Sequence, residues 1–244
     1  MKKILLFTII LLSIQLANAQ PKFSLSGGVK LIKPDNRDMT LWYVDESPSM
    51  DNCYRSVKQD GNLAINFSAR YQDNDLNRKY HFFVEGQGYI GSINGLALNI
   101  GAVYISNYDS KVRIQPEIAG VIGYCTKGLG EIENNDIYIQ VNDTKFQDYT
   151  NVNVALRNIY FGIKPGLSFI AKAGSDNEIG VGASFQLSGK IGMLAFSGAD
   201  QEGNNVTETE NLNADNVYFM VDGDKTDVIP YNPDGIELKV FFNF

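Results

Sequence analysis

The last ten residues constrain the fold of this chain more than any other stretch. Gly235 to Phe244 reads G-I-E-L-K-V-F-F-N-F, in which apolar and polar side chains alternate except at Phe241. A period of two places successive side chains on opposite faces of a β-strand, so this strand has one apolar and one polar side. The apolar side carries Ile236, Leu238, Val240, Phe242 and Phe244, and the other carries Glu237, Lys239 and Asn243.

Seven more segments alternate in the same way. None of the eight apolar faces carries a charge, as lipid contact would require, because burying a charge at bilayer depth costs about 2–4 kcal/mol. The eight segments are 23–32, 61–71, 80–91, 95–106, 111–124, 155–171, 178–191 and 235–244.

A soluble β-sandwich also contains alternating strands, but lengths favour a barrel. The internal segments have 10 to 17 residues, whereas soluble strands centre on about five or six and a membrane crossing needs about 9–11. Short connections also alternate with long ones, which is typical of periplasmic turns and outer loops. The short ones are 72–79, 107–110 and 172–177, the long ones are 33–60, 125–154 and 192–234, and only 92–95 is short on the long side.

We therefore predict an all-β fold, a transmembrane antiparallel up-and-down β-barrel of eight strands. Pro116 and Pro165 lie inside neighbouring strands, and because proline removes a ladder hydrogen bond we expect a bulge there. Ile137–Val141 and Val217–Val221 resemble short strands, which would form hairpins above the membrane or raise the count to ten. Six aromatic residues are expected at the periplasmic rim as a girdle: Phe23, Tyr71, Tyr80, Tyr104, Phe169 and Phe244.

The N-terminal residues read as a signal peptide. Lys2 and Lys3 precede the uncharged run from Ile4 to Leu16, and Ala17-Asn18-Ala19 forms a small-x-small cleavage site. We expect residues 1–19 to be removed and residues 20–244 to form the barrel domain. A formal net charge of −7 argues against nucleic acid as a partner, because such a protein needs a basic face.

Taken together, the leader, the eight alternating strands and the terminal aromatic motif resemble small outer-membrane β-barrels of the OmpA/OmpX type. The resemblance rests on architecture and covers the whole mature chain. It implies the outer membrane of a Gram-negative cell, contact with outer-membrane lipid and a monomeric protein. It also implies that the barrel-assembly machinery reads the terminal strand through Leu238, Val240, Phe242 and Phe244.

Nine charged residues fall on the predicted inner faces. Residue counting places Glu117 level with Lys164, and Glu237 near Lys190 and Lys30. In an eight-stranded barrel side chains nearly fill the interior, so paired charges would plug the lumen. The alternative is a narrow pore that prefers anions, because cations outnumber acids. The nine residues are Lys30, Arg70, Glu85, Arg113, Glu117, Lys164, Lys190, Glu237 and Lys239.

Three further features suggest chemistry. His81, the single histidine, is the natural general base, but its place at a strand start suggests a polar rim residue. Cys53 and Cys125 are expected on the same outer side, so a disulfide is geometrically allowed, with two separate thiols as the alternative. The acidic segment containing Asp222, Asp224 and Asp227 resembles a calcium loop, but it lacks the glycine and distal glutamate of that motif, so we favour a solvated acidic loop over a calcium site.

The leading functional hypothesis is a non-enzymatic barrel that needs no cofactor and displays long extracellular loops to an unknown extracellular partner or ligand. A narrow small-solute channel is the alternative from another class. A barrel enzyme acting on lipid or peptide is the third. The long connections are expected to carry binding, and deletion of about residues 200–230 is expected to leave folding intact.

Overall fold

The structure is a computed structural model. The predicted signal peptide lies outside the residues that it describes. Those residues are 22–33, 39–43, 53–57, 62–75, 78–132, 139–174, 177–212, 217–231 and 233–244.

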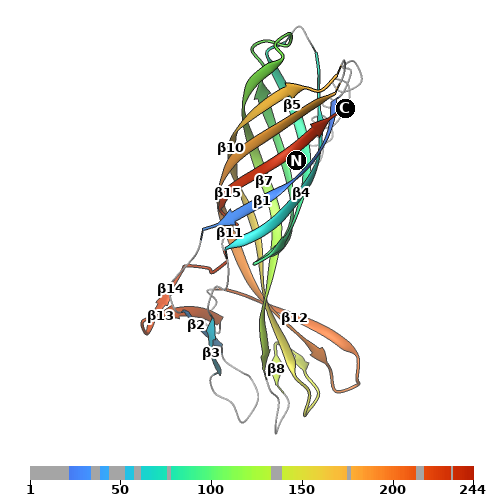
Figure 1. Cartoon of the computed structure of the whole chain (residues 1–244). Helices are drawn as coiled ribbons and strands as arrows, with labels where there is room; N and C mark the ends of the chain where they lie inside the picture. Colours follow the sequence, from blue (N-terminus) through green and yellow to red (C-terminus); the bar gives the residue numbers. More distant parts are fainter. Residues whose placement is uncertain are drawn as a thin grey trace, which may run out of the picture.

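Eight antiparallel strands pair into a closed ring (Figure 1). β1 pairs with β4 on one side and β15 on the other, and β10 pairs with β11, so each ring strand has two neighbours. The predicted all-β, antiparallel fold is confirmed, and each of the eight alternating segments is a strand. The ring strands are β1 (Lys22–Ile32), β4 (Leu63–Gln72), β5 (Tyr80–Gly91), β6 (Asn94–Tyr104), β7 (Val112–Ile132), β10 (Val152–Lys172), β11 (Glu178–Ala199) and β15 (Gly235–Asn243).

The two prolines fit the ring without the bulge that we predicted. Pro165 pairs with Ile118, and the β10–β11 ladder is interrupted between the pairs Ile163–Leu187 and Gly166–Ser184 without a change of register. Pro116 lies just beyond Val103–Glu117, the last pair of β6 and β7 on that side. Each proline therefore occupies a point where a neighbouring ladder is open, so no extra residue is needed.

Three strands continue past the ring into a second folded region. β7, β10 and β11 have 21, 21 and 22 residues. Pairing of β6 with β7 ends at Asn94–Thr126, beyond which β7 and β10 still pair, and β12 (Asn205–Asn211) joins β11. The described β7–β10 ladder shifts register between Val154 and Ala155, where Leu129 is left unpaired beside Gly130, whose φ is +113°.

A separate four-stranded sheet lies beside this continuation (Figure 1). We call the strands beyond the ring, together with this sheet, the extension. The sheet has the order β14-β13-β2-β3, and a small hairpin, β8–β9, lies outside both sheets. Their bounds are β2 (Met39–Tyr43), β3 (Cys53–Val57), β8 (Gln140–Val141), β9 (Thr144–Lys145), β13 (Val217–Val221) and β14 (Asp224–Thr226).

The extension corrects two expectations. The segments 33–60, 125–154 and 192–234 are not simple loops, because each contributes strands to it. Val217–Val221 forms β13 in the separate sheet, and Gln140–Val141 pairs only with β9 among the described residues, so the ten-stranded alternative is wrong.

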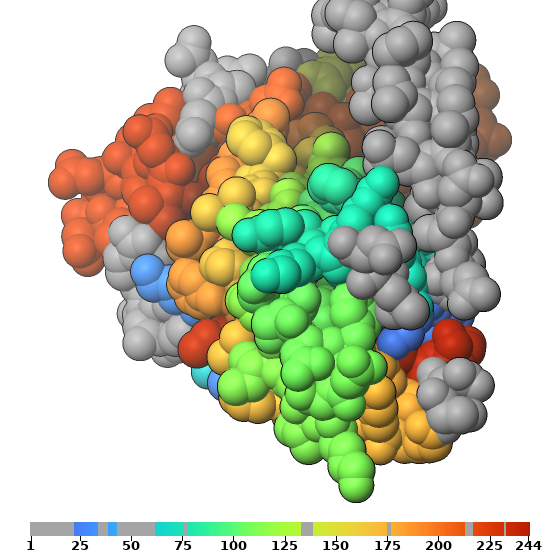
Figure 2. All heavy atoms as spheres, turned by 90° about the horizontal axis from the view of Figure 1, so that it is seen from above, coloured from blue at the N-terminus to red at the C-terminus, as the bar shows by residue number. Residues whose placement is uncertain are grey.

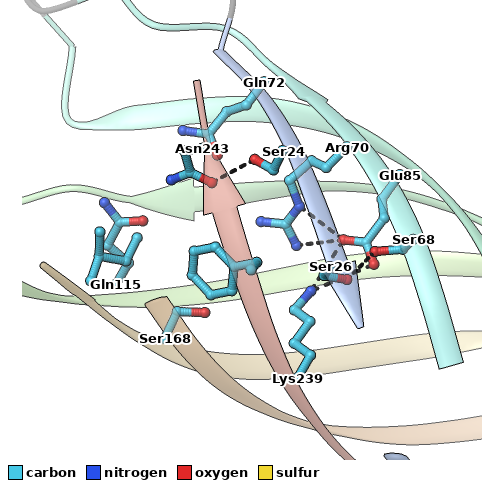
Figure 3. A pocket seen from close by; sticks show the side chains of 12 residues that line it. Ser24, Ser26, Ser68, Arg70, Gln72, Glu85, Gln115, Ser168, Lys239 and Asn243 are labelled. Carbon is cyan, nitrogen blue, oxygen red and sulfur yellow. Dashed lines mark hydrogen bonds and ion pairs between the residues drawn. The ribbon is translucent and has the colours of Figure 1, made fainter. Parts of the chain in front are cut away.

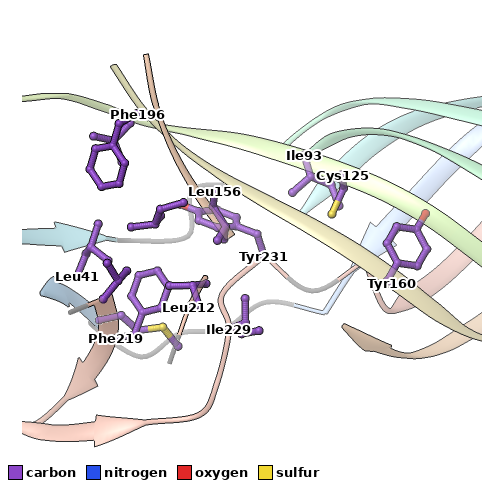
Figure 4. Packing of buried hydrophobic residues seen from close by; sticks show 14 of the residues in the cluster. Leu41, Ile93, Cys125, Leu156, Tyr160, Phe196, Leu212, Phe219, Ile229 and Tyr231 are labelled. Atoms are coloured by element: carbon purple, nitrogen blue, oxygen red, sulfur yellow. The ribbon is translucent and has the colours of Figure 1, made fainter. Parts of the chain in front are cut away.

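The main hydrophobic core lies between the extension's sheets and continues into the adjoining end of the ring (Figure 4). Leu41 and Phe219 come from the separate sheet, Leu156 and Phe196 come from the continuing ring strands, and all four are at most 1% exposed. Tyr160 lies at the ring end of the same cluster. The extension is thus held by apolar packing that it shares with the adjoining end of the ring.

Candidate functional site

The outer surface of the ring is a band of exposed apolar side chains, which we call the belt. Phe67, Leu96 and Phe161 are 52%, 66% and 60% exposed, and all eight ring strands contribute. Exposed apolar patches of this extent mark a surface that another apolar phase or a partner covers. The terminal-strand residues Leu238, Val240, Phe242 and Phe244 belong to the belt.

Aromatic residues of the predicted girdle gather at the end of the ring where β1 begins and β15 ends. The rings of Phe23 and Phe244 lie 5.5 Å apart, and those of Tyr80 and Tyr104 lie 5.1 Å apart. Tyr71 is paired in register with Phe23, and Phe169 is exposed near the same end of β10.

The inner surface of the ring is polar. All nine charged residues selected from the sequence lie there: six are buried, and Arg70, Glu117 and Lys190 are half-buried. No belt residue is charged. Alternation along the strands therefore places ionic groups inside and apolar groups outside.

One ionic cluster lies in the half of the ring near the termini (Figure 3). Arg70 contacts Glu85 at 2.7 Å and Glu117 at 2.8 Å, and Lys239 lies 3.2 Å from Glu85. Arg70 also stacks on the ring of Phe83, with 3.9 Å from the guanidinium carbon to the centroid. Two cations thus share two acids, and the groups come from four different strands.

A second cluster lies farther toward the extension. Lys164 lies 2.9 Å from Glu237, and Gln87 donates to Glu237 at 2.5 Å. The predicted Glu117–Lys164 pair is therefore wrong. The two residues lie at nearly the same height on neighbouring strands, but each forms its ion pair with a residue on a more distant strand of the ring. Lys30 is paired in register with Glu237, as residue counting placed it, and its ammonium donates a hydrogen bond to Gln186.

Lys190 is placed differently from the prediction that grouped it with Glu237. Its ammonium donates to the carbonyl oxygen of Ile229, in the chain that returns from the extension. This contact ties the mouth of the ring to the extension.

Glu178 is a buried ionic residue that the sequence reasoning missed. It accepts hydrogen bonds from Arg113 at 2.5 Å, Lys22 at 2.8 Å and Asn243 at 3.0 Å, at the end of the ring near the termini. Its position could have been found from the alternation of β11, because it shares a face with Ser184 and Gln186.

Little open space remains around the first ionic cluster. The cavity lined by Ser24, Arg70, Gln115 and Lys239 has a volume of about 20 Å³, which is room for a single water molecule. Figure 2 looks onto the end with the termini, where the β4–β5 turn (teal) lies beside the β6–β7 turn (green). The described side chains thus leave little open space around this cluster.

His81 connects these two turns. Its Nδ1 lies 3.1 Å from Asp73 of the β4–β5 turn, and its Nε2 hydrogen-bonds the hydroxyl of Tyr108 in the β6–β7 turn. Burial, followed by the neighbouring Asp73 and Asp75 charges, raises the pKa of Tyr108 to about 12 against the opposing effect of Arg113. The side chain of His81 is fully buried, so the arrangement is a link between turns.

The cysteine prediction is not supported. Cys125 is a buried free thiol in the apolar cluster near Tyr160, not half of a disulfide. Cys53 begins β3, and its side chain lies outside the described residues. Cys125 also does not end its strand, because β7 continues to Ile132.

The alternative of a calcium site finds no support. Asp222 and Gly223 have φ of +54° and +90° and form the tight turn between β13 and β14, which matches the type I′ turn of a two-residue hairpin. Within the described ranges, no three histidine, cysteine or acidic side chains come together as metal ligands. Asp224 and Asp227 are exposed on and after β14.

The described part of the chain contains no helix with the length and hydropathy needed to span a membrane. No protein-family model and no curated protein sequence matches the chain.

Proposed function

We propose that this chain is an outer-membrane β-barrel without enzymatic activity, whose ring spans the bilayer and whose extension is held at the cell surface for partner binding. The exposed belt around a ring with a charged interior is the observation that carries this proposal. A soluble protein would need another protein to cover that belt, whereas a bilayer covers all of it at once.

The closed pairing supports the same reading. A membrane-spanning sheet must leave no unpaired edge in hydrocarbon, and every ring strand has two neighbours. The girdle-like pairs Phe23–Phe244 and Tyr80–Tyr104 fit the periplasmic interface. The extension then lies on the outer side.

The scaffold role is favoured over a channel because the ring interior is occupied. Arg70, Glu85, Glu117 and Lys239 bridge strands across it, and conduction would require displacing these bonded side chains. A barrel enzyme finds no support in His81, because that side chain is buried between turns rather than open to a substrate.

Heat modifiability tests the proposal. The purified chain in detergent should migrate faster on a gel when unboiled than when boiled, and it should partition with outer-membrane vesicles after sodium carbonate extraction. A chain that stays soluble without detergent and migrates identically in both forms would overturn the proposal. Planar bilayer recordings should show no regular conductance steps, and reproducible steps would favour the channel.

A further inference from the structure

The extension ends in a strand with one open edge. β12 is the last strand of its sheet and pairs with β11, and no described strand lies on its other side. In Figure 1 it forms the outer border of the extension. An edge of this kind presents backbone donors and acceptors that can pair with another extended chain.

The ladder with β11 shows which backbone groups are open. Leu212 donates its N–H to the carbonyl of Gly192 at 3.0 Å. Hydrogen-bonded pairs recur at every second residue of an antiparallel ladder, so Glu208 and Glu210 bond to β11. The N–H and C=O groups of Thr207 and Thr209 therefore point to the open edge.

Natural edges are commonly protected by charged side chains, above all lysine, by proline or by a bulge. β12 has no lysine, proline or bulge: its sequence is N-V-T-E-T-E-N, its pairing with β11 is regular, and its only protecting charges are Glu208 and Glu210. Its two charges are both acidic. Glu208 is held in place by hydrogen bonds from Thr144 at 2.5 Å and Asn142 at 3.5 Å.

The charge pattern argues against a second copy as the occupant. A symmetric antiparallel pair centred on Glu208 puts that residue opposite itself, and one centred on Thr209 puts Glu208 opposite Glu210. A pair centred on Thr207 avoids both, but it sets Glu208 opposite Val206 and gives the carboxylate no cation. Like charges directly opposite each other destabilise a strand pair. A segment with basic residues at alternate positions instead places a cation opposite each glutamate.

We propose that the open edge of β12 binds an extended basic segment of a partner protein by adding it as an antiparallel strand. Basic side chains of the segment lie opposite Glu208 and Glu210, and its intervening residues bond to the backbone of Thr207 and Thr209. This proposal rests on the proposed surface-display role and names the partner chemistry for it.

The register makes a sharp test with a peptide of alternating lysine and threonine, KTKTKTKTK, added to the full chain in detergent. Residues opposite Thr207 and Thr209 form the hydrogen-bonded pairs, so the threonine N–H groups of the peptide bond to β12 and the lysine N–H groups point away. N-methylation of the threonines should weaken binding roughly tenfold or more, because several strand hydrogen bonds are lost. N-methylation of the lysines should leave binding nearly unchanged.

Protein variants give the matched comparison. Thr209→Pro removes an open N–H while the β11 ladder remains, and it should weaken binding, whereas Thr209→Val keeps the N–H and should bind as the parent does. Glu208→Gln with Glu210→Gln should weaken binding most at low salt.

Equal affinity of the two methylated peptides would mean charge attraction alone and would overturn the proposal. The proposal would also be overturned if KTKTKTKTK did not bind the chain, or if the acidic peptide ETETETETE bound it with the same affinity. The comparison of the two methylated peptides uses the unmodified protein, so it remains valid even if Thr209→Pro does not fold. Heat modifiability of the same sample tests the barrel proposal separately. A failure of peptide binding therefore overturns only the edge-strand proposal, and the barrel proposal is decided by the gel.

Discussion

The ring and the extension are built from some of the same strands, yet their sidedness is opposite. Along β10, Ile159, Phe161 and Ile163 face outward in the ring and are exposed. Beyond the ring, Val154 and Leu156 face inward and are buried, while Asn153 is exposed. The inner face thus changes from polar to apolar along a continuous strand.

This difference shows that the same pair of strands can have a polar inner face in the ring and an apolar inner face in the extension. In the ring the inner face packs ionic pairs and the outer face carries exposed apolar side chains. In the extension the inner face meets a second sheet, so hydrophobic burial lies inside and polar residues face water. The switch occurs near Arg157 and Asn158, about where β6 has ended beside β7.

Deletion of residues 200–230 should have the largest effect. The sequence alone led us to expect intact folding, but the strands in this segment mean that the deletion should unfold the extension and spare the ring. It removes β12, β13 and β14 together with Val217 and Phe219 of the shared core. The ring pairs do not involve these strands. Limited trypsin digestion should then cleave near Lys127 and Arg157, while heat modifiability persists. Loss of heat modifiability would show that the two regions do not fold independently.

Glu85→Ala should be next in size. It leaves Arg70 and Lys239 short of a buried partner, which costs about 3–5 kcal/mol when a buried pair is broken. Glu208→Ala on the extension should cost about 1 kcal/mol or less, as for partly exposed groups. Urea unfolding in lipid vesicles measures both, and equal losses would contradict a tightly packed ring interior.

A pair of arginine substitutions on β10 should show the smallest of the three effects and test sidedness directly. Ile163→Arg places a charge in the belt and should cost about 2–4 kcal/mol in a bilayer. Asn153→Arg makes the same change on the outer face of the extension and should stay within about 0.5 kcal/mol. Similar costs at the two positions, measured by urea unfolding in vesicles, would mean that the belt does not meet lipid.

Much of the ring could be predicted from the sequence, because strand alternation reports directly which side chains share a face. Ionic partners could not. Glu117 and Lys164 lie at nearly the same height, but Arg70 reaches Glu117 across the ring. Sequence spacing gives the height of a residue along its strand, but it does not show which side chains are long enough to meet across a closed interior. The missed Glu178 was accessible, since it continues the inner face of β11.

The extension could be predicted only in part. Its signal is a change of parity: Val152, Val154 and Leu156 occupy even positions, whereas Ile159 and Phe161 occupy odd ones. That change indicates that the apolar side chains move from one face of the strand to the other, but it does not show which segment packs on the new apolar face. The covering strands β2 and β13 are more than a hundred residues apart in the chain.

The sequence by itself determined the class of fold, the eight ring strands and the side of each strand that is apolar, because alternation with a period of two is a local property of the backbone. The tertiary structure decided ring closure, the partners of each buried charge, the free state of Cys125 and the second sheet over the extension. These depend on contacts between distant segments, and many pairings of distant segments are compatible with the same local pattern.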